Sequence, residues 1–267
     1  MPSTIERAFR EKLCEPRIHQ PEPIYRHDHP LSASTKLIPA PKIIRFTSTN
    51  ELIGVGQRTL RDIRARNAMR QRMPQDEPGL FIRTEGDVIE ISCLSLLHPV
   101  NIAANVALLD QSGCLECRQQ MNIIIASLEH KNTNMLFHKD FADANVTSEA
   151  AARDILRLLQ PSPGQPAPDL QHDDEPTMLK DNGYEISKQA KKYSQHGDML
   201  DVAVFDWKAM IVFDFSDVSE TLENPRPTRL CAFQELTASD VDISNGFTFR
   251  TFLLGFLIKA LWRHGLA

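Results

Sequence analysis

Two polar side chains, Gln189 and Tyr193, lie four residues apart in a segment that precedes two apolar runs, 201–206 and 209–215. Residues four apart are neighbours on one face of a helix. The segment 185–196 has helical spacing of its apolar residues, so we expect a short helix that leaves the glutamine and the tyrosine near the edge of a sheet. A tyrosine on a helix face is also a common half-buried packing residue, and a glutamine at a helix edge is commonly solvated.

The two apolar runs carry a second candidate, because Asp206 and Lys208 stand between them in the pattern Asp-x-Lys. A carboxylate and a lysine can help to hold a divalent metal and activate water, with Asp181 or Asp201 as the upstream acid. On a strand the pair would share a face, but the stretch 206–209 also suits a four-residue turn. Asp206 and Lys208 are the catalytic candidates. Magnesium is the expected cofactor only for an active enzyme, and otherwise none is predicted.

A pair of cysteines, Cys114 and Cys117, is followed by His130 with the spacing of three zinc ligands. His138 comes too late for the usual fourth position, and the residues between 117 and 130 have helical character. We therefore expect two ordinary thiols at the start of a helix, with a structural zinc site as the open alternative. No metal ligand is assigned from the sequence.

The most basic stretch of the chain is 50–73, which we expect to form one helix that ends before Pro74. It holds six arginines against two acids, and Arg58, Arg61 and Arg64 are among them. One interpretation is a face that binds phosphate groups. The favoured interpretation is an exposed helix whose arginines pair with acids elsewhere.

The composition is that of an ordinary globular protein, with 42% of the 267 residues hydrophobic and 24% charged. The formal net charge of −5 excludes a globally basic nucleic-acid binder, so such binding would need a local patch. Five scattered cysteines and the lack of an apolar leader favour an intracellular protein of the cytoplasm or nucleus. The apolar block 247–262 is too short and too charged for a membrane span, so we expect a buried helix and no membrane partner.

The sequence divides into four segments. Residues 1–41 are rich in proline and predict a flexible arm. Residues 42–159 predict a helical and β part of the core, and 160–176 a linker or surface loop rich in proline and acid. The last segment, 177–267, predicts an α/β unit with strands buried on both faces. We therefore expect an α/β fold in which a mixed β-sheet is flanked by helices.

Within the N-terminal part, 79–97 predicts a hairpin whose turn is 85–87. The segment 101–130 predicts helical structure that is interrupted near Gly113, and 134–140 is a strand candidate. Thr147 to Glu149 can open a short helix over 150–159, with an acid early and an arginine later.

The ordered pattern of the C-terminal unit resembles the PD-(D/E)XK nuclease-like superfamily. It is nearest to the branch that holds type I restriction enzymes, RecB-type nucleases and their fungal relatives. In that branch a Gln-x-x-x-Tyr helix follows the catalytic strand and precedes a hairpin and another helix. Here Gln189 and Tyr193, the hairpin 201–215 and the helix 248–264 fit that layout, over roughly residues 176–264. The resemblance implies a restriction-endonuclease-like core.

Members of that superfamily that cut need an upstream acid and a (D/E)-x-K pair. Before the expected helix this chain offers Lys180, but Met178 stands where the carboxylate should be. A thioether cannot replace a hard oxygen ligand for magnesium.

The leading hypothesis is a nuclease-like protein without metal-dependent cleavage. Its partner, nucleic acid or another protein, would be bound by the set Gln189, Tyr193, Lys180, Arg58, Arg61 and Arg64. The alternatives are a scaffold with no nucleic-acid role and an active metal-dependent nuclease. The oligomeric state is left open.

Overall fold

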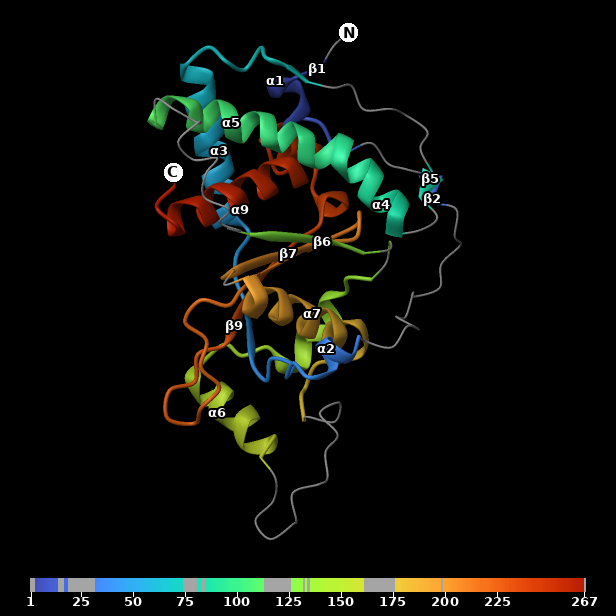
Figure 1. Cartoon of the computed structure of the whole chain (residues 1–267), viewed down its shortest axis with the longest axis vertical. Helices are drawn as coiled ribbons and strands as arrows, with labels where there is room; N and C mark the ends of the chain where they lie inside the picture. The colour runs from blue at the N-terminus through green and yellow to red at the C-terminus, as the bar shows by residue number, and fades with distance from the viewer. Residues whose placement is uncertain are drawn as a thin grey trace.

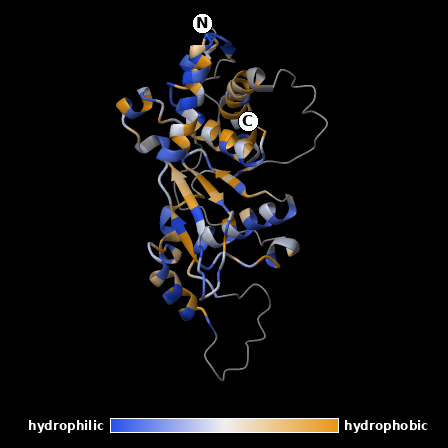
Figure 2. Cartoon of the chain, turned by 90° about the vertical axis from the view of Figure 1, so that its left-hand side faces the viewer, coloured by the Kyte–Doolittle hydropathy of each residue, from blue (hydrophilic) through white to orange (hydrophobic). Residues whose placement is uncertain are grey.

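The computed structural model describes residues 3–13, 17–18, 32–73, 81–82, 85–112, 126–131, 133, 135–160, 176–197 and 199–266. Its centre is a mixed five-stranded β-sheet with helices on both faces, so the predicted α/β fold is confirmed (Figure 1). One layer of helices lies above the sheet in this view and the other below it. The strands at the centre are mostly hydrophobic (Figure 2), because both of their faces are covered.

The strand order across the sheet is β3-β9-β8-β7-β6. The three central strands, β9 (Thr228–Phe233), β8 (Met210–Asp214) and β7 (Asp201–Phe205), form an antiparallel meander. The outer strands, β3 (Ile44–Phe46) and β6 (Ser127–His130), pair in parallel with β9 and β7. The expected hairpin of the two apolar runs is therefore confirmed as β7 and β8, whose residues are all buried.

One face of the sheet is covered by α3 (Asn50–Ala65), α5 (His98–Ser112) and α9 (Phe249–Arg263). The expected buried C-terminal helix is confirmed as α9. Thr248 begins it by accepting the backbone N–H of Thr251 at 3.2 Å, which satisfies one free donor of the first turn.

Two glycines let α3 and α9 cross with their backbones in contact. A Cβ atom added at Gly255 would clash with the carbonyl oxygen of Leu52, and one added at Gly56 would clash with that of Thr251. Only glycine, which has no Cβ, permits so close an approach. This crossing fixes the position of α3 over the sheet.

The opposite face is covered by α7 (Asp181–Gly197), with α2 (Ala33–Lys36) and the 3-10 helix η3 (His138–Ala144) beside it. The expected helix 185–196 is confirmed as α7, which begins four residues earlier than predicted. Ile186 and Ala190 are buried against the sheet, as their spacing predicted.

The remaining described elements lie around these layers. The expected short helix near 150–159 is confirmed as α6 (Glu149–Leu158), capped by Ser148. Two short helices, η5 (Glu235–Thr237) and α8 (Asp240–Ser244), connect β9 to α9. The two-residue strands β2 (Arg17–Ile18) and β5 (Phe81–Ile82) pair with each other in parallel. Residues 161–175 of the predicted linker lie outside the described residues.

The prediction of a flexible arm is wrong for residues 3–13. Strand β1 (Ser3–Thr4) pairs with β4 (Arg72–Met73), and α1 (Ile5–Ala8) follows it directly. Ile5, Phe9 and Leu13 are buried in the same core as α3 and α9. The burial of these apolar side chains outweighs the local lack of periodicity.

The predicted hairpin over 79–97 is also wrong. Glu85 begins α4 (Glu85–Ser92), which continues through the π-helical turn η1 (Cys93–Leu97) into α5. The stretch Gly86–Leu108 is, among the described residues, long and apolar enough to cross a membrane, but half of it is buried. A core helix has the same character, so this stretch does not identify a membrane protein.

The helix expected over 101–130 is wrong at its end, because Ser127–His130 form strand β6. The strand expected over 134–140 is wrong as well, since η3 occupies 138–144. The helix expected over 50–73 ends at Ala65, where Asn67 turns the chain with a left-handed φ of 60°. In each case pairing or packing against distant residues decides the local structure.

Candidate functional site

Asp206, the first catalytic candidate, is a structural residue of the β7–β8 turn. It is fully buried, and its two oxygens accept four backbone N–H bonds of 2.8–3.0 Å, from Met135, Leu136, Lys208 and Ala209. Burial raises the pKa of Asp206 to about 6, against the effect of these bonds. The carboxylate thus closes the turn and ties it to the segment after β6. Both oxygens are occupied, which leaves no position for a metal.

Lys208 does not complete an Asp-x-Lys site either. It lies in the turn, where the preceding Trp207 has a left-handed φ of 72°. Its backbone N–H, and not its ammonium group, bonds Asp206. The two side chains therefore do not share a strand face, and the prediction of a catalytic pair is corrected to a turn motif.

Lys180 lies in the loop before α7 and is exposed. Its Nζ is 2.5 Å from Asp143 of η3, and this hydrogen bond raises the pKa of the lysine above its ordinary value. Met178, which stands where a carboxylate was sought, packs against the core on the α7 side. No strand precedes α7 within 176–180, so this loop is not the catalytic strand that the resemblance implies.

Gln189 and Tyr193 lie on α7 at the edge of its buried face. Both are half-buried, and Tyr193 packs against the core on that side of the sheet. The side-chain oxygen of Gln189, Oε1, is buried and finds no hydrogen-bond partner among the described residues. A buried acceptor without a donor costs about 1–3 kcal/mol. Such a cost points to a position that a ligand or a water completes.

Strand β6 carries a pair that the sequence reasoning missed. Glu129 and Lys131 lie two residues apart, and their side chains form an ion pair of 2.9 Å. Glu129 pairs in register with Val204, whose side chain is in the core on the α7 side. His130, between them, faces the other layer and meets Phe205 edge-on at 6.1 Å. The two charged groups therefore share the α7 side of the sheet.

Helix α7 packs on β7 and η3 and is bonded to the segment that follows β6. Asn182, in its first turn, donates its side-chain N–H to the carbonyl oxygen of Met135 at 3.2 Å. Gln189 lies two helical turns after Asn182, on the same stripe of the helix. We refer to Glu129, Lys131, Gln189 and Tyr193 as the β6–α7 corner, a name that groups them by the side of the sheet that they share. Along the chain, β6 comes first, η3 and α6 follow, and then come α7 and the β7–β8 hairpin.

A magnesium ion would need more ligands than this corner offers. Within the described residues, no group of three His, Cys, Asp or Glu side chains is placed to hold a metal. Glu129 is the one carboxylate of the corner, and Lys131 neutralises it. Cys114 and Cys117 lie outside the described residues, so the zinc alternative stays a prediction.

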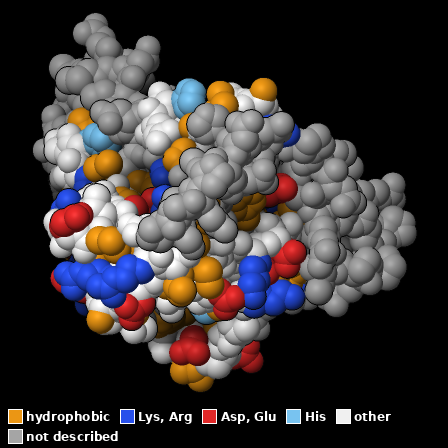
Figure 3. Space-filling model, turned by 90° about the horizontal axis from the view of Figure 1, so that it is seen from below, with side chains coloured by type: hydrophobic (Ala, Val, Ile, Leu, Met, Phe, Trp, Pro, Cys, Tyr) orange, Lys and Arg blue, Asp and Glu red, His pale blue; other side chains and the backbone are white. Residues whose placement is uncertain are grey.

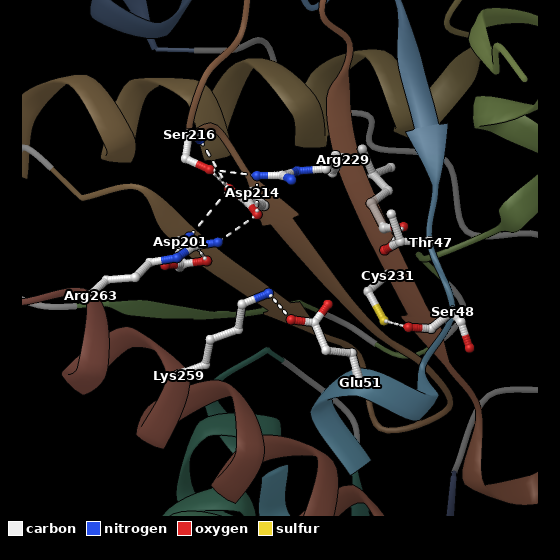
Figure 4. A network of polar contacts seen from close by, with 11 residues as sticks. Thr47, Ser48, Glu51, Asp201, Asp214, Ser216, Arg229, Cys231, Lys259 and Arg263 are labelled. Atoms are coloured by element: carbon white, nitrogen blue, oxygen red, sulfur yellow. Dashed lines mark hydrogen bonds and ion pairs between the residues drawn. The ribbon is translucent and has the colours of Figure 1, made fainter. Parts of the chain in front are cut away.

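A second charged group lies on the other face of the sheet, beside α9. Arg263 bonds Asp201 of β7 at 2.6 Å and Asp214 of β8 at 2.7 Å (Figure 4). Arg229 of β9 adds a bond to Asp214 of 3.0 Å. We refer to Asp201, Asp214, Arg229 and Arg263 as the Arg263 network. Asp201, Asp214 and Arg229 of this network line a small cavity of about 100 Å³. Glu51 and Lys259, which pair at 2.7 Å, line it as well.

The Arg263 network shifts the pKa of its two carboxylates in opposite directions. Burial raises the pKa of Asp201 above its ordinary value, although Arg263 opposes the shift. Burial acts in the same way on Asp214, but the hydrogen bonds from Arg263 and Ser216 outweigh it and hold that pKa below its ordinary value. Each acid of the network already has a cation, so the network has the character of a structural clamp and not of a metal site.

The arginines of α3 do not join the β6–α7 corner. Arg58, Arg61 and Arg64 belong to the layer on the opposite face of the sheet. Arg64 pairs with Glu6 of α1 at 3.1 Å, whereas Arg58 and Arg61 make no ion pair among the described residues. On the surface seen from the α6 end, basic and acidic side chains are interspersed (Figure 3). The predicted site residues thus fall into two groups on two sides of the molecule.

Comparison with known proteins gives no relative for this chain. No family model matches it, and neither does any curated protein or solved structure. The structure establishes an α/β fold with a mixed five-stranded sheet. Any kinship with nucleases depends on the order of β6, α7 and the β7–β8 hairpin.

Proposed function

We propose that this chain is a nuclease-like protein that binds nucleic acid at the β6–α7 corner without magnesium-dependent cleavage. The order of elements carries the proposal. Glu129 lies on β6 and Lys131 directly after it, and Gln189 and Tyr193 follow later in the chain on α7. The β7–β8 hairpin comes next, and β9, η5 and α8 then precede α9. The resemblance to the PD-(D/E)XK superfamily implies this order.

The charges of the corner support binding without cleavage. Cleavage by that superfamily needs a second carboxylate to hold the metal with the (D/E)-x-K acid. Among the described residues, no group of three His, Cys, Asp or Glu side chains is placed to hold a metal ion. Lys131 is only 4% exposed and is bonded to Glu129, so the pair is already neutral. The backbone N–H of Lys131 bonds the carbonyl oxygen of Phe205 at 2.8 Å, which holds the end of β6 beside β7.

The groups that could meet a nucleic acid are polar and few. Tyr193 offers an aromatic ring at the helix edge, and a ring of this kind can stack on a base. Gln189 offers an amide whose buried oxygen lacks a donor among the described residues, and an amino group of a base would bond it only after the side chain turns outward. Lys180 is the exposed cation nearest to the start of α7. With so few cations, binding should depend only weakly on salt, with a slope of roughly −1 to −2.

Fluorescence anisotropy with short single-stranded and double-stranded oligonucleotides tests the proposal. We expect binding that falls only modestly between about 50 and 200 mM salt. Gln189→Ala and Tyr193→Ala should each weaken it by about tenfold. Arg58→Ala is the matched control, because Arg58 is exposed on the other side of the sheet and should change little. Absence of binding at low salt would reject the proposal in favour of a scaffold protein without a nucleic-acid role.

Plasmid nicking with magnesium decides the question of cleavage. We expect the wild-type protein to nick the plasmid no more than a Glu129→Gln variant does. Nicking that is lost in both Glu129→Gln and Lys131→Met would contradict the proposal. It would also place the missing carboxylate among residues outside the described part of the chain.

A further inference from the structure

A cavity of about 390 Å³ lies between α1, α3 and the end of α8. Arg10, Arg61 and Arg64 line it together with a single acid, Glu6. Its size falls at the lower end of the range of about 300–1,000 Å³ that is usual for small-molecule sites. The cavity therefore has room for one compact ligand.

The charges around the cavity are unbalanced. Glu6 is shared between Arg64, at 3.1 Å, and Arg10, at 3.6 Å. Arg61 forms no ion pair among the described residues, although it lines the cavity. Three positive charges against one negative leave a net charge of two. An anion with two negative charges would neutralise the site.

The rest of the lining is apolar or already bonded. Phe9 and Met69 are buried at 1% and 7% exposure, and Leu60 packs beside them. Gln57 donates its side-chain N–H to the carbonyl oxygen of Asn245 at 2.8 Å, which joins α3 to the loop after α8. The wall is thus fixed, and an apolar floor lies beneath the guanidinium groups.

We propose that this cavity binds a phosphomonoester carried on a compact ring compound, of which a nucleoside monophosphate is the type. A phosphomonoester is close to doubly charged at neutral pH and matches the net charge of two. Guanidinium groups bind phosphate oxygens in a fork with two parallel hydrogen bonds. The ring would lie against Phe9, Leu60 and Met69. The ligand is either a free nucleotide or the 5′-phosphorylated end of a strand.

This proposal does not depend on the proposed function. The cavity lies on the α3 and α9 side of the sheet, whereas the β6–α7 corner lies on the α7 side. Failure of one site to bind its ligand would leave the other unaffected.

Isothermal titration calorimetry with adenosine 5′-monophosphate, adenosine and inorganic phosphate tests the proposal. We expect the monophosphate to bind more tightly than either fragment, because only it uses both the arginines and the apolar floor. Arg61→Glu should weaken it by at least about tenfold. Arg58→Glu is the matched control, since it makes the same change of charge on the same helix outside the cavity. Circular dichroism confirms that both variants fold.

Three results would overturn the proposal: no binding of the monophosphate, equal binding of adenosine or phosphate, or equal losses in the two variants. A 5′-phosphorylated oligonucleotide and its 5′-hydroxyl form separate the two sources of ligand. Preference for the phosphorylated strand over the free monophosphate, lost in Arg61→Glu, assigns the cavity to strand ends. The reverse preference assigns it to a free nucleotide.

Discussion

On the α9 side of the sheet, Arg263 bonds Asp201 from one strand and Asp214 from the next, so a single side chain links a helix to two strands. On the α7 side, Glu129 and Lys131 pair within one strand and link no separate elements. The first arrangement contributes to the stability of the fold. The second leaves α7 free of an ionic bond to β6 and leaves a buried oxygen of Gln189 without a donor among the described residues. This difference separates charges that hold the structure from groups available to a ligand.

The largest effect should come from Asp206→Ala, because it leaves four backbone N–H groups without their acceptor. We expect a loss of about 3–5 kcal/mol in the free energy of unfolding. Urea denaturation measures it. Lys208→Ala is the control, since its backbone N–H bond remains, and it should cost less than about 1 kcal/mol. Equal losses in the two variants would show that the side chain of Lys208 shares the structural role of Asp206.

The next effect should come from Arg263→Met, which leaves two largely buried carboxylates without their shared cation. The side chain of Arg263 is 21% exposed, so we expect a loss of about 2–3 kcal/mol. Lys259→Met breaks the pair with Glu51, whose side chain is 63% exposed, and should cost under about 1 kcal/mol. A larger loss in Lys259→Met would contradict the structural role of the Arg263 network.

The difference in stability between wild type and Arg263→Met should shrink in acid. The pKa of Asp214 lies below its ordinary value, so its contribution is present above pH about 4 and is lost as pH falls through the folded-state pKa. The pKa of Asp201 lies above its ordinary value, so Asp201 loses its charge first. Denaturation between pH 7 and 3 should therefore show the gap falling by about 1–2 kcal/mol. If this difference in the free energy of unfolding stays constant with pH, charge pairing is not its cause.

The smallest effect on stability should come from Gln189→Leu. Replacing the buried oxygen that lacks a donor by an apolar group should change the free energy of unfolding by about 0–1 kcal/mol, in the stabilising direction. Gln57→Leu removes the bond to Asn245 and should lower the free energy of unfolding by about 1 kcal/mol. We expect Gln189→Leu to lose nucleic-acid binding even so. A marked loss of stability would mean that Gln189 is a structural residue.

The sequence predicted those elements whose structure is decided locally. The spacing of Ile186 and Ala190 identified α7, and two apolar runs around a turn identified the β7–β8 hairpin. Strand β6 was missed because Ser127–His130 follow a segment with helical periodicity. Only the pairing of these residues with β7 makes them a strand. Residues 3–13 were missed for the same reason, since their burial depends on helices far away in the sequence.

Only half of the residues of the candidate site could be predicted from the sequence. Gln189 and Tyr193 were found from their spacing on one helix. Glu129 and Lys131 were not, because a Glu-x-Lys pair shares a face only if the segment is extended. Asp206 and Lys208 have the spacing of a pair that shares a strand face, but they lie in a turn. There the carboxylate bonds the backbone of its own turn. The conformation of the backbone, and not the pattern of letters, decides which pair can act together.

The glycine crossing of α3 and α9 has a mechanical consequence. Because Gly56 and Gly255 place backbone against backbone, no side chains at the crossing can change rotamer and let one helix slide past the other. The two helices must shift as one rigid body. Glu51 and Arg61 stand on the same helix, about 15 Å apart by its rise per residue. A displacement of Arg61 would therefore move α3 and α9 together across the sheet and leave the Glu51–Lys259 contact between them unchanged.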